Sequence, residues 1–431
     1  MLQTLRSAFK VPELRRKMLF TVIILVLYRI GAVVPVPYVS SDVLSYLMSQ
    51  GEGSIFQYLN ILSGDAFSKA TLFALSISPY ITSSIVMQLL TIAIPALEKL
   101  QKSGEEGKKK ITQITRYITV ALGLITAYGY YMYMRNYGVL TDTGLFAAVV
   151  IIACYSAGTA LIMWLAEKIN ENGVGNGISL ILFANILSSG PQIISVLLSF
   201  IKSPTFRSWG TVIAELIIIV ALAIVVFVVF ITNSERRLPV QYAKKVVGRK
   251  MYGGQSTHLP IKLNMSGVMP IIFANSIVAL PSTLSLLFAK PAEGGFWDKM
   301  QKFLSHTSWF YALLFFILII AFAYFYIAIS FNPIEVANNL KKNGGFIPGI
   351  RPGKPTSDYI TKILGRITLI GALFLGFIAV FPLVVNMVTG SALGSIAFGG
   401  SSLLIVIGVA LETFREIEAQ MTMRHYKGFL E

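Results

Sequence analysis

The segment LFAAVVIIACYSAGTALIMWLA occupies residues 145–166, and none of its 22 side chains is charged. At 1.5 Å per residue, a helix of that length is about 33 Å long, which is enough to cross the roughly 30 Å hydrocarbon core of a bilayer. The composition agrees, because 55% of the 431 residues are hydrophobic and only 13% are charged, too apolar a balance for a soluble protein of this length. The sequence therefore predicts a protein that crosses the membrane several times.

Apolar runs of similar length recur on both sides of this segment, separated by charged or Gly- and Pro-rich breaks. The predicted spans are residues 18–34, 71–94, 113–134, 145–166, 178–201, 211–232, 267–289, 308–329, 363–386 and 401–418. The predicted fold class is an all-α membrane protein with ten transmembrane helices. Ten spans divide into two sets of five, residues 1–201 and 202–431, and an odd number per half means that any internal duplication is an inverted one.

The distribution of basic residues predicts the orientation in the membrane. With the N-terminus in the cytoplasm, 28 of the 36 Lys and Arg residues fall in cytoplasmic segments, 7 fall outside and Arg29 lies within the first span. Both termini are therefore expected in the cytoplasm. This positive charge either only sets the topology beside anionic lipid or also marks binding surfaces. Two cytoplasmic loops, residues 233–263 and 330–362, are longer than turns and rich in Gly and Pro, and such loops usually bind a partner.

Ionisable groups at membrane depth are nearly absent. Glu215 and Glu412 lie near the ends of their spans, whereas ion-coupled transporters need carboxylates at membrane depth. The chain also lacks HExxH and Walker motifs, and Cys154 is the one cysteine, so no enzyme chemistry, cofactor or metal site is expected. The energy for any transport must come from a partner.

Proline interrupts the second and seventh spans, at Pro79 and Pro270. In an inverted duplication these spans correspond, and broken helices at matching positions point to a transport path. The alternative is that each proline only kinks a lipid-facing helix.

The stretch from Gly53 to Gly64 is amphipathic but too short to span. Ile55, Phe56, Leu59 and Leu62 fall on one helical face, and the helix is about 17 Å long. It is either an interfacial helix on the external side or a re-entrant one.

Several motifs, taken together, resemble one protein family. They are YRIG (28–31), PVP (35–37), SPYIT (78–82), GEEG (104–107), MWL (163–165), GNGIS (175–179), QSTHLP (255–260), PGIRPG (348–353) and SLLI (402–405). They run in family order over nearly the whole chain, and the sequence is similar to the SecY family, the large subunits of the bacterial protein-conducting channel.

The resemblance implies an hourglass of two inverted halves held by SecE, together with SecG, in the inner membrane. It implies a lateral gate between the second and third spans on one side and the seventh and eighth on the other. It also identifies residues 53–64 as a re-entrant plug built on Ile55, Phe56, Leu59 and Leu62. The pore ring that it implies consists of Ile77, Ile81, Ile178, Leu182, Ile272 and Ile405, which composition alone would leave as ordinary lipid-facing aliphatics.

The resemblance also implies residues that contact substrates and partners. Gln88 and Asn275 are assigned to the lateral gate, where Asn275 is either a polar gate contact or a packing residue between helices. The two long loops become docking sites for the SecA motor ATPase and the ribosome, with Arg351 as the main contact. Contacts to ribosomal RNA phosphates are expected from Arg236, Arg237, Lys244, Lys245, Arg249 and Lys250. The substrates are signal sequences and unfolded secretory polypeptides; the rival functions are a small-solute transporter and a non-conducting scaffold.

Overall fold

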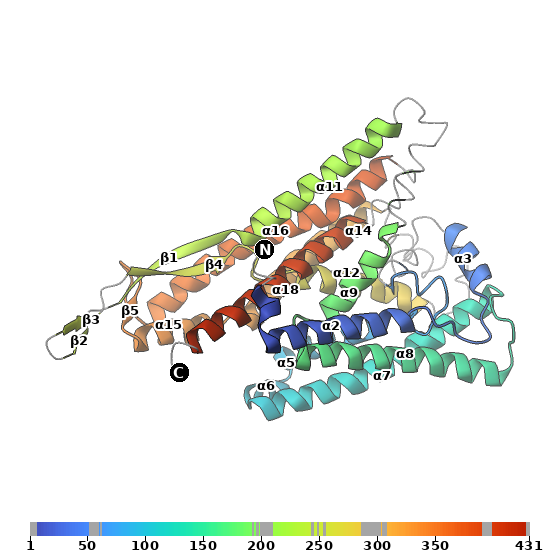
Figure 1. The fold of residues 1–431 in the computed structure, drawn as a ribbon, viewed down its shortest axis with the longest axis horizontal. Helices are drawn as coiled ribbons and strands as arrows, with labels where there is room; N and C mark the ends of the chain where they lie inside the picture. Colours follow the sequence, from blue (N-terminus) through green and yellow to red (C-terminus); the bar gives the residue numbers. More distant parts are fainter. Residues whose placement is uncertain are drawn as a thin grey trace.

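The computed structural model describes residues 7–50, 60, 63–191, 194, 198, 210–242, 245–247, 250–252, 256–285, 303, 308–389 and 399–427. Its helices form an elongated bundle with two sides (Figure 1). One side contains α2 (Pro12–Gly31), α3 (Ser41–Gln50), α5 (Ser78–Ala93), α6 (Pro95–Lys102), α7 (Glu105–Asn136), α8 (Leu145–Asn172) and α9 (Gly177–Ser188). The other contains α11 (Gly210–Asn233), α12 (Met269–Ser285), α14 (Trp309–Ser330), α15 (Pro333–Lys342), α16 (Lys354–Thr389) and α18 (Gly399–Lys427).

Each of the ten predicted apolar runs overlaps a helix in part or in full, namely α2, α5, α7, α8, α9, α11, α12, α14, α16 and α18. By length and composition alone, four helical segments of the described residues can cross a membrane: Leu145–Asn172, Glu215–Asn233, Trp309–Lys342 and Lys354–Val385. The bent pair α5 and α6 makes a fifth, while α9 and α12 are shorter apolar helices. The helices α2, α7 and α18 each join an apolar stretch to a charged end.

The second predicted span becomes helical later than expected. Helix α5 begins at Ser78, and residues 64–77 form turns, with positive φ at Asp65, Ala70 and Ser76. Proline is favoured in the first turn of a helix, where its missing N–H is not needed, and Pro79 occupies that position. The turns are held inside the bundle, because the Tyr130 hydroxyl of α7 donates a hydrogen bond to the backbone carbonyl of Phe67 at 2.6 Å.

Pro270 lies in the same kind of position as Pro79, in the first turn of α12. Both prolines are buried. They therefore start helices inside the bundle and do not kink lipid-facing ones. Pro95 begins α6, and the chain bends there by 102° between α5 and α6.

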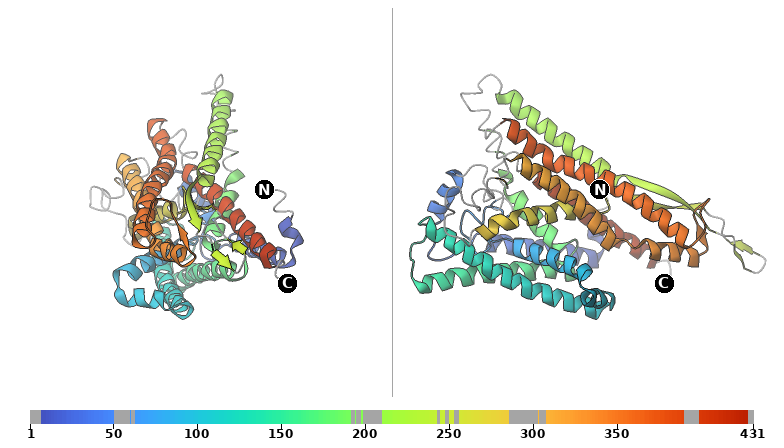
Figure 2. Two further views of the ribbon diagram at one scale, coloured as in Figure 1. Left: turned by 90° about the vertical axis from the view of Figure 1, so that its left-hand side faces the viewer. Right: turned by 180° about the vertical axis from the view of Figure 1, so that it is seen from behind.

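The first long loop folds as a β-hairpin that projects from one end of the bundle (Figures 1 and 2). Strand β1 (Glu235–Tyr242) pairs antiparallel with β4 (Ser256–Lys262), and β2 (Lys245–Val247) pairs with β3 (Lys250–Tyr252) toward the tip. The second loop contributes β5 (Gly345–Phe346), which pairs with the end of β1. The sequence analysis did not predict these strands. The membrane-embedded body is helical as expected, and the sheet belongs to the loops.

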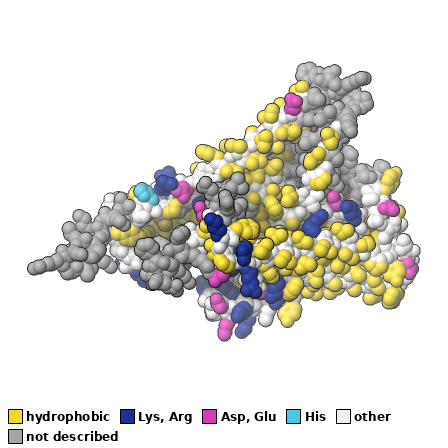
Figure 3. Space-filling view, viewed as in Figure 1, with side chains coloured by type: hydrophobic (Ala, Val, Ile, Leu, Met, Phe, Trp, Pro, Cys, Tyr) yellow, Lys and Arg dark blue, Asp and Glu magenta, His cyan; other side chains and the backbone are white. Residues whose placement is uncertain are grey.

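The outer surface of the helices is strongly apolar. Phe230, Val226 and Phe377 are about two-thirds exposed, and apolar side chains cover most of the helical surface seen in Figure 3. Exposed apolar area on this scale is expected where lipid is the solvent, since hydrocarbon chains are as apolar as these side chains.

Candidate pore and docking surface

A cavity of about 90 Å³ lies between helices of the two sides of the bundle. It is bounded by α5, α7, α9, α12, α18 and the turns before α5. Four of the six predicted ring residues line it: Ile81, Leu182, Ile272 and Ile405. Residues more than 300 positions apart in sequence thus meet at one place.

The other two predicted ring residues pack beside the cavity and do not line it. Ile77 is fully buried and immediately precedes α5, and Ile178 is partly buried near the start of α9. Both belong to the same hydrophobic cluster as the four lining residues. The structure therefore places four of the six predicted residues around one cavity and the other two elsewhere in the same extended core cluster.

Local sequence fixes where each lining helix starts. At the beginning of α9, the Asn176 side chain accepts hydrogen bonds from the backbone N–H groups of Ile178 and Ser179, at 3.0 and 3.4 Å. Such an N-cap satisfies donors that the first helical turn leaves free. The cap sets the register that turns Leu182 toward the cavity.

The two predicted gate residues lie in different places. Asn275 is 5% exposed and lines the central cavity beside Ile272, and its Nδ2 atom has no hydrogen-bond partner among the described residues. Gln88 lines a second cavity of about 190 Å³ between α5, α6 and α7, and its Nε2 donates to the Ser84 hydroxyl at 3.3 Å. Helix α12 packs against α5 and α7, so Asn275 is the one of the two at the interface between the sides.

The lining of the cavity is mainly apolar, with Ser, Thr and Asn side chains among the aliphatic ones. Among the residues that the structure describes, none with an ionisable side chain lines it, and a volume of about 90 Å³ has room for only a few water molecules.

The two long loops, residues 233–263 and 330–362, form one structural unit. Besides the pairing of β1 with β5, they share a hydrophobic cluster built on Leu238, Val240, Ile261, Ile347, Ile360, Ile363, Leu364 and Ile367. Side chains alternate along β1, with Leu238 and Val240 buried and Arg237 exposed. The predicted docking residues of both loops therefore sit on a common base.

The described docking residues point to solvent. Arg351 is exposed, and its backbone carbonyl accepts a hydrogen bond from the Thr356 hydroxyl at 2.8 Å. Arg236 and Arg237 are exposed on β1, and Arg237 pairs with Glu235 at 2.7 Å.

Several predicted residues fall outside what the structure describes. These are the plug residues Ile55, Phe56, Leu59 and Leu62, and the loop residues Lys244 and Arg249. Lys245 and Lys250 lie in β2 and β3, whose side chains are not described.

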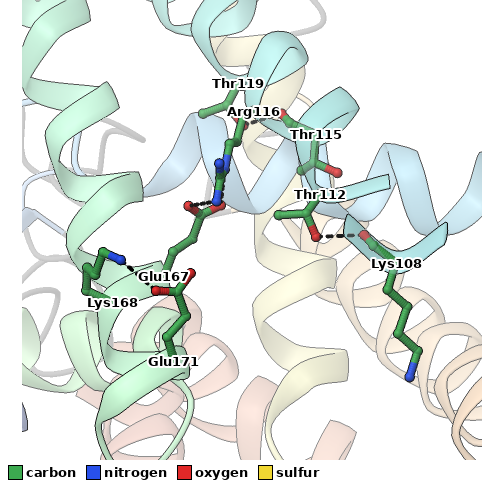
Figure 4. Close-up of polar contacts among 8 residues, drawn as sticks. All are labelled: Lys108, Thr112, Thr115, Arg116, Thr119, Glu167, Lys168 and Glu171. Atoms are coloured by element: carbon green, nitrogen blue, oxygen red, sulfur yellow. Dashed lines mark hydrogen bonds and ion pairs between the residues drawn. The ribbon is translucent and has the colours of Figure 1, made fainter. Parts of the chain in front are cut away.

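Sequence reasoning missed an ion pair that joins α7 to α8 (Figure 4). Arg116 reaches both carboxylate oxygens of Glu167, with Nε 2.9 Å from Oε1 and Nη2 2.8 Å from Oε2. One turn further along α7, Thr119 hydrogen-bonds Ser83 of α5. The only sequence signal was a pair of opposite charges near the ends of two adjacent predicted spans, which does not by itself specify a contact.

Comparisons with known proteins agree on one family. The SecY family model matches residues 71–414. A protein translocase subunit SecY of Streptomyces galbus is 42% identical, with both chains covered completely. A solved structure described as that of a protein conducting channel aligns with a TM-score of 0.66 and 17% identity, over 94% of this chain and 92% of the other. Sec61 in the canine ribosome-channel complex aligns with a TM-score of 0.62 and 16% identity, over the same shares of the two chains.

The fold, the aliphatic cavity and the full-length relatives lead to a single assignment. This chain belongs to the SecY family, whose members are non-enzymatic channel subunits of protein translocases.

Proposed function

We propose that this chain forms the passive path by which unfolded secretory polypeptides cross the bacterial inner membrane, with both termini in the cytoplasm. The observation that supports this most is the central cavity, whose lining takes Ile81 and Leu182 from the proposed half 1–201 and Ile272 and Ile405 from the proposed half 202–431. A path at the junction of two halves can widen when the halves separate, without unfolding either.

The proposed ring works because its side chains are aliphatic and flexible. Ile77 and Ile178 complete the ring beside the four lining residues. Such side chains deform around any passing polypeptide, and they seal by excluding water when the channel is empty. The plug, residues 53–64, adds a second closure on the external side.

The proposed lateral gate lies between α5 and α7 on one side and α12 and α14 on the other, with Asn275 on α12 and Gln88 nearer the cytoplasmic end of α5. A signal sequence is an apolar helix that gains free energy by leaving water for lipid. Its binding therefore stabilises the parted state over the closed one.

The proposed partners are SecE and SecG in the membrane and SecA or the ribosome at the cytoplasmic unit. Sec61 and yeast Ssh1, which have similar folds, were solved in complexes with ribosomes. Arg351 and the basic residues of the hairpin are the proposed contacts, and anionic lipid faces the remaining cytoplasmic charge.

Cysteine crosslinking tests the path. A stalled secretory polypeptide should crosslink to cysteines placed at Ile81 and Ile405 in a Cys154→Ala background. The matched control is Val226→Cys on α11, where the side chain is 68% exposed on the outer surface. Adducts at Val226 with none at the two cavity positions, in a correctly inserted protein, would reject the channel.

A further inference from the structure

The base of the hairpin connects directly to helices. Helix α11 ends at Asn233 and is separated from β1 by one residue, and β4 ends at Lys262 and is separated from α12 by six residues. The Leu263 N–H donates a hydrogen bond to the Ser234 carbonyl at 2.9 Å, which closes the base. A force on the hairpin therefore acts on α11 and, through β4, on α12.

Arg415 of α18 is hydrogen-bonded to this base from a helix that is remote in sequence. Its Nη2 donates to the backbone carbonyl of Thr232 at 2.5 Å and to Asn233 Oδ1 at 2.8 Å. A cation at the end of α11 is favoured by the helix dipole, and hydrogen bonds from a charged donor are stronger than neutral ones. Burial and, secondarily, the charge of Arg415 lower the pKa of Lys262, which agrees with a guanidinium close to the base.

Two glycines allow helices to pack closely against the base of the hairpin. A Cβ on Gly408 of α18 would lie 2.0 Å from Val268 Cγ1, and one on Gly371 of α16 would lie 2.5 Å from the Leu263 carbonyl oxygen. The base is thus packed tightly between α16 and α18. Tight packing transmits a displacement, because the interior has no free volume to absorb it.

We infer that Arg415 is a positioning residue that couples the cytoplasmic hairpin to α18, so that a ribosome docked on the hairpin moves Ile405 together with Ile272. Ile405 lies ten residues before Arg415 on α18, about 15 Å along the helix axis. Ile272 is on α12, which continues from β4. Without Arg415, the hairpin remains covalently connected to α12 through the backbone. The hydrogen bonds from Arg415 of α18 to Thr232 and Asn233 at the base are lost. The inference rests on the proposed ring.

The experiment uses the assembled translocase in planar bilayers and proteoliposomes, with ribosomes bearing a nascent chain that has an apolar signal sequence. Docking is measured by co-flotation with the proteoliposomes, and opening by the rise in ion conductance on docking. The variants are Arg415→Gln, Arg415→Lys and Asn233→Ala, and the matched control is Arg366→Gln, which removes an exposed arginine from α16.

Translocase that carries Arg415→Gln should bind an amount of ribosome within about twofold of that bound by the unchanged translocase. Its rise in ion conductance on docking should be smaller by a factor of at least about five, which is the lower end of the usual range of coupling between two sites. Arg415→Lys should recover part of the response because it keeps a charged donor, and Asn233→Ala should lose part of it. Arg366→Gln should respond normally.

A full response from Arg415→Gln, or a loss of docking in parallel with conductance, would overturn the inference. If Arg415→Gln does not assemble, a normal response from Asn233→Ala would overturn it equally. An unchanged chain that docks ribosomes and never conducts would instead defeat the proposed function.

Discussion

The ion pair between Arg116 and Glu167 leads to an asymmetric prediction for its two neutral variants. The Glu167 side chain is 9% exposed and the Arg116 side chain is 43% exposed. Arg116→Gln therefore leaves a carboxylate buried without its partner, whereas Glu167→Gln leaves a guanidinium that can reach water. The first variant should be clearly the less stable of the two.

The magnitude follows from the exposure of the two groups. Breaking a fully buried pair costs about 3–5 kcal/mol, and an exposed pair is worth about 0–1 kcal/mol. Because Arg116 is almost half exposed, solvent screening places Arg116→Gln between these limits, at about 2 kcal/mol. Glu167→Gln should cost about 1 kcal/mol, since the amide oxygen still accepts one hydrogen bond.

The assay is unfolding of the purified chain in mixed detergent micelles, followed by tryptophan fluorescence, because Trp164 lies one turn from Glu167 on α8. The control is Lys168→Gln, which breaks the more exposed pair with Glu171 and should cost under about 0.5 kcal/mol. Equal losses for Arg116→Gln and Lys168→Gln, or a greater loss for Glu167→Gln than for Arg116→Gln, would refute the reasoning.

Three further outcomes are expected. Gly158→Ala should lower stability by about 1–3 kcal/mol, because its Cβ would lie 2.0 Å from the Leu72 carbonyl oxygen, whereas Gly365→Ala, which meets nothing within 4 Å, should be neutral or stabilising in the same unfolding assay. Arg351→Glu should abolish motor-driven secretion while the protein still co-purifies with SecE, and normal export into inverted vesicles would remove Arg351 from the docking site. Deletion of residues 55–62 should raise the resting ion conductance of a planar bilayer, and conductance at baseline would mean that this segment is not part of the seal.

The spans could be predicted from sequence because the length of an apolar run is a property of contiguous residues. The start of α5 could not be predicted from the sequence, because residues 72–77 are as apolar as the helix that follows. Contacts with distant residues hold that stretch out of the helix: the Leu72 N–H donates to the Val34 carbonyl, Thr71 pairs with Pro35, and the Tyr130 hydroxyl donates to the Phe67 carbonyl. Local propensity does not contain such information.

The hairpin and the site depended on contacts between distant residues. The segment ERRLPVQY, residues 235–242, is charged and contains proline, so it was assigned to a loop; its pairing with β4 and β5 makes it a strand. The ring aliphatics are indistinguishable by composition from lipid-facing ones, and only the resemblance singled them out. The contacts of Arg415 could not be predicted from the sequence, because its hydrogen-bond acceptors on α11 are more than 180 residues away.

The central claim is that a polypeptide passes through the aliphatic cavity between the two halves. The most direct measurement is a structure of the assembled translocase holding a stalled secretory polypeptide. The account predicts an extended backbone running between Ile81, Leu182, Ile272 and Ile405, with the cavity widened well beyond its present 90 Å³ or so. A polypeptide bound elsewhere, with those four side chains still closed on one another, would contradict it.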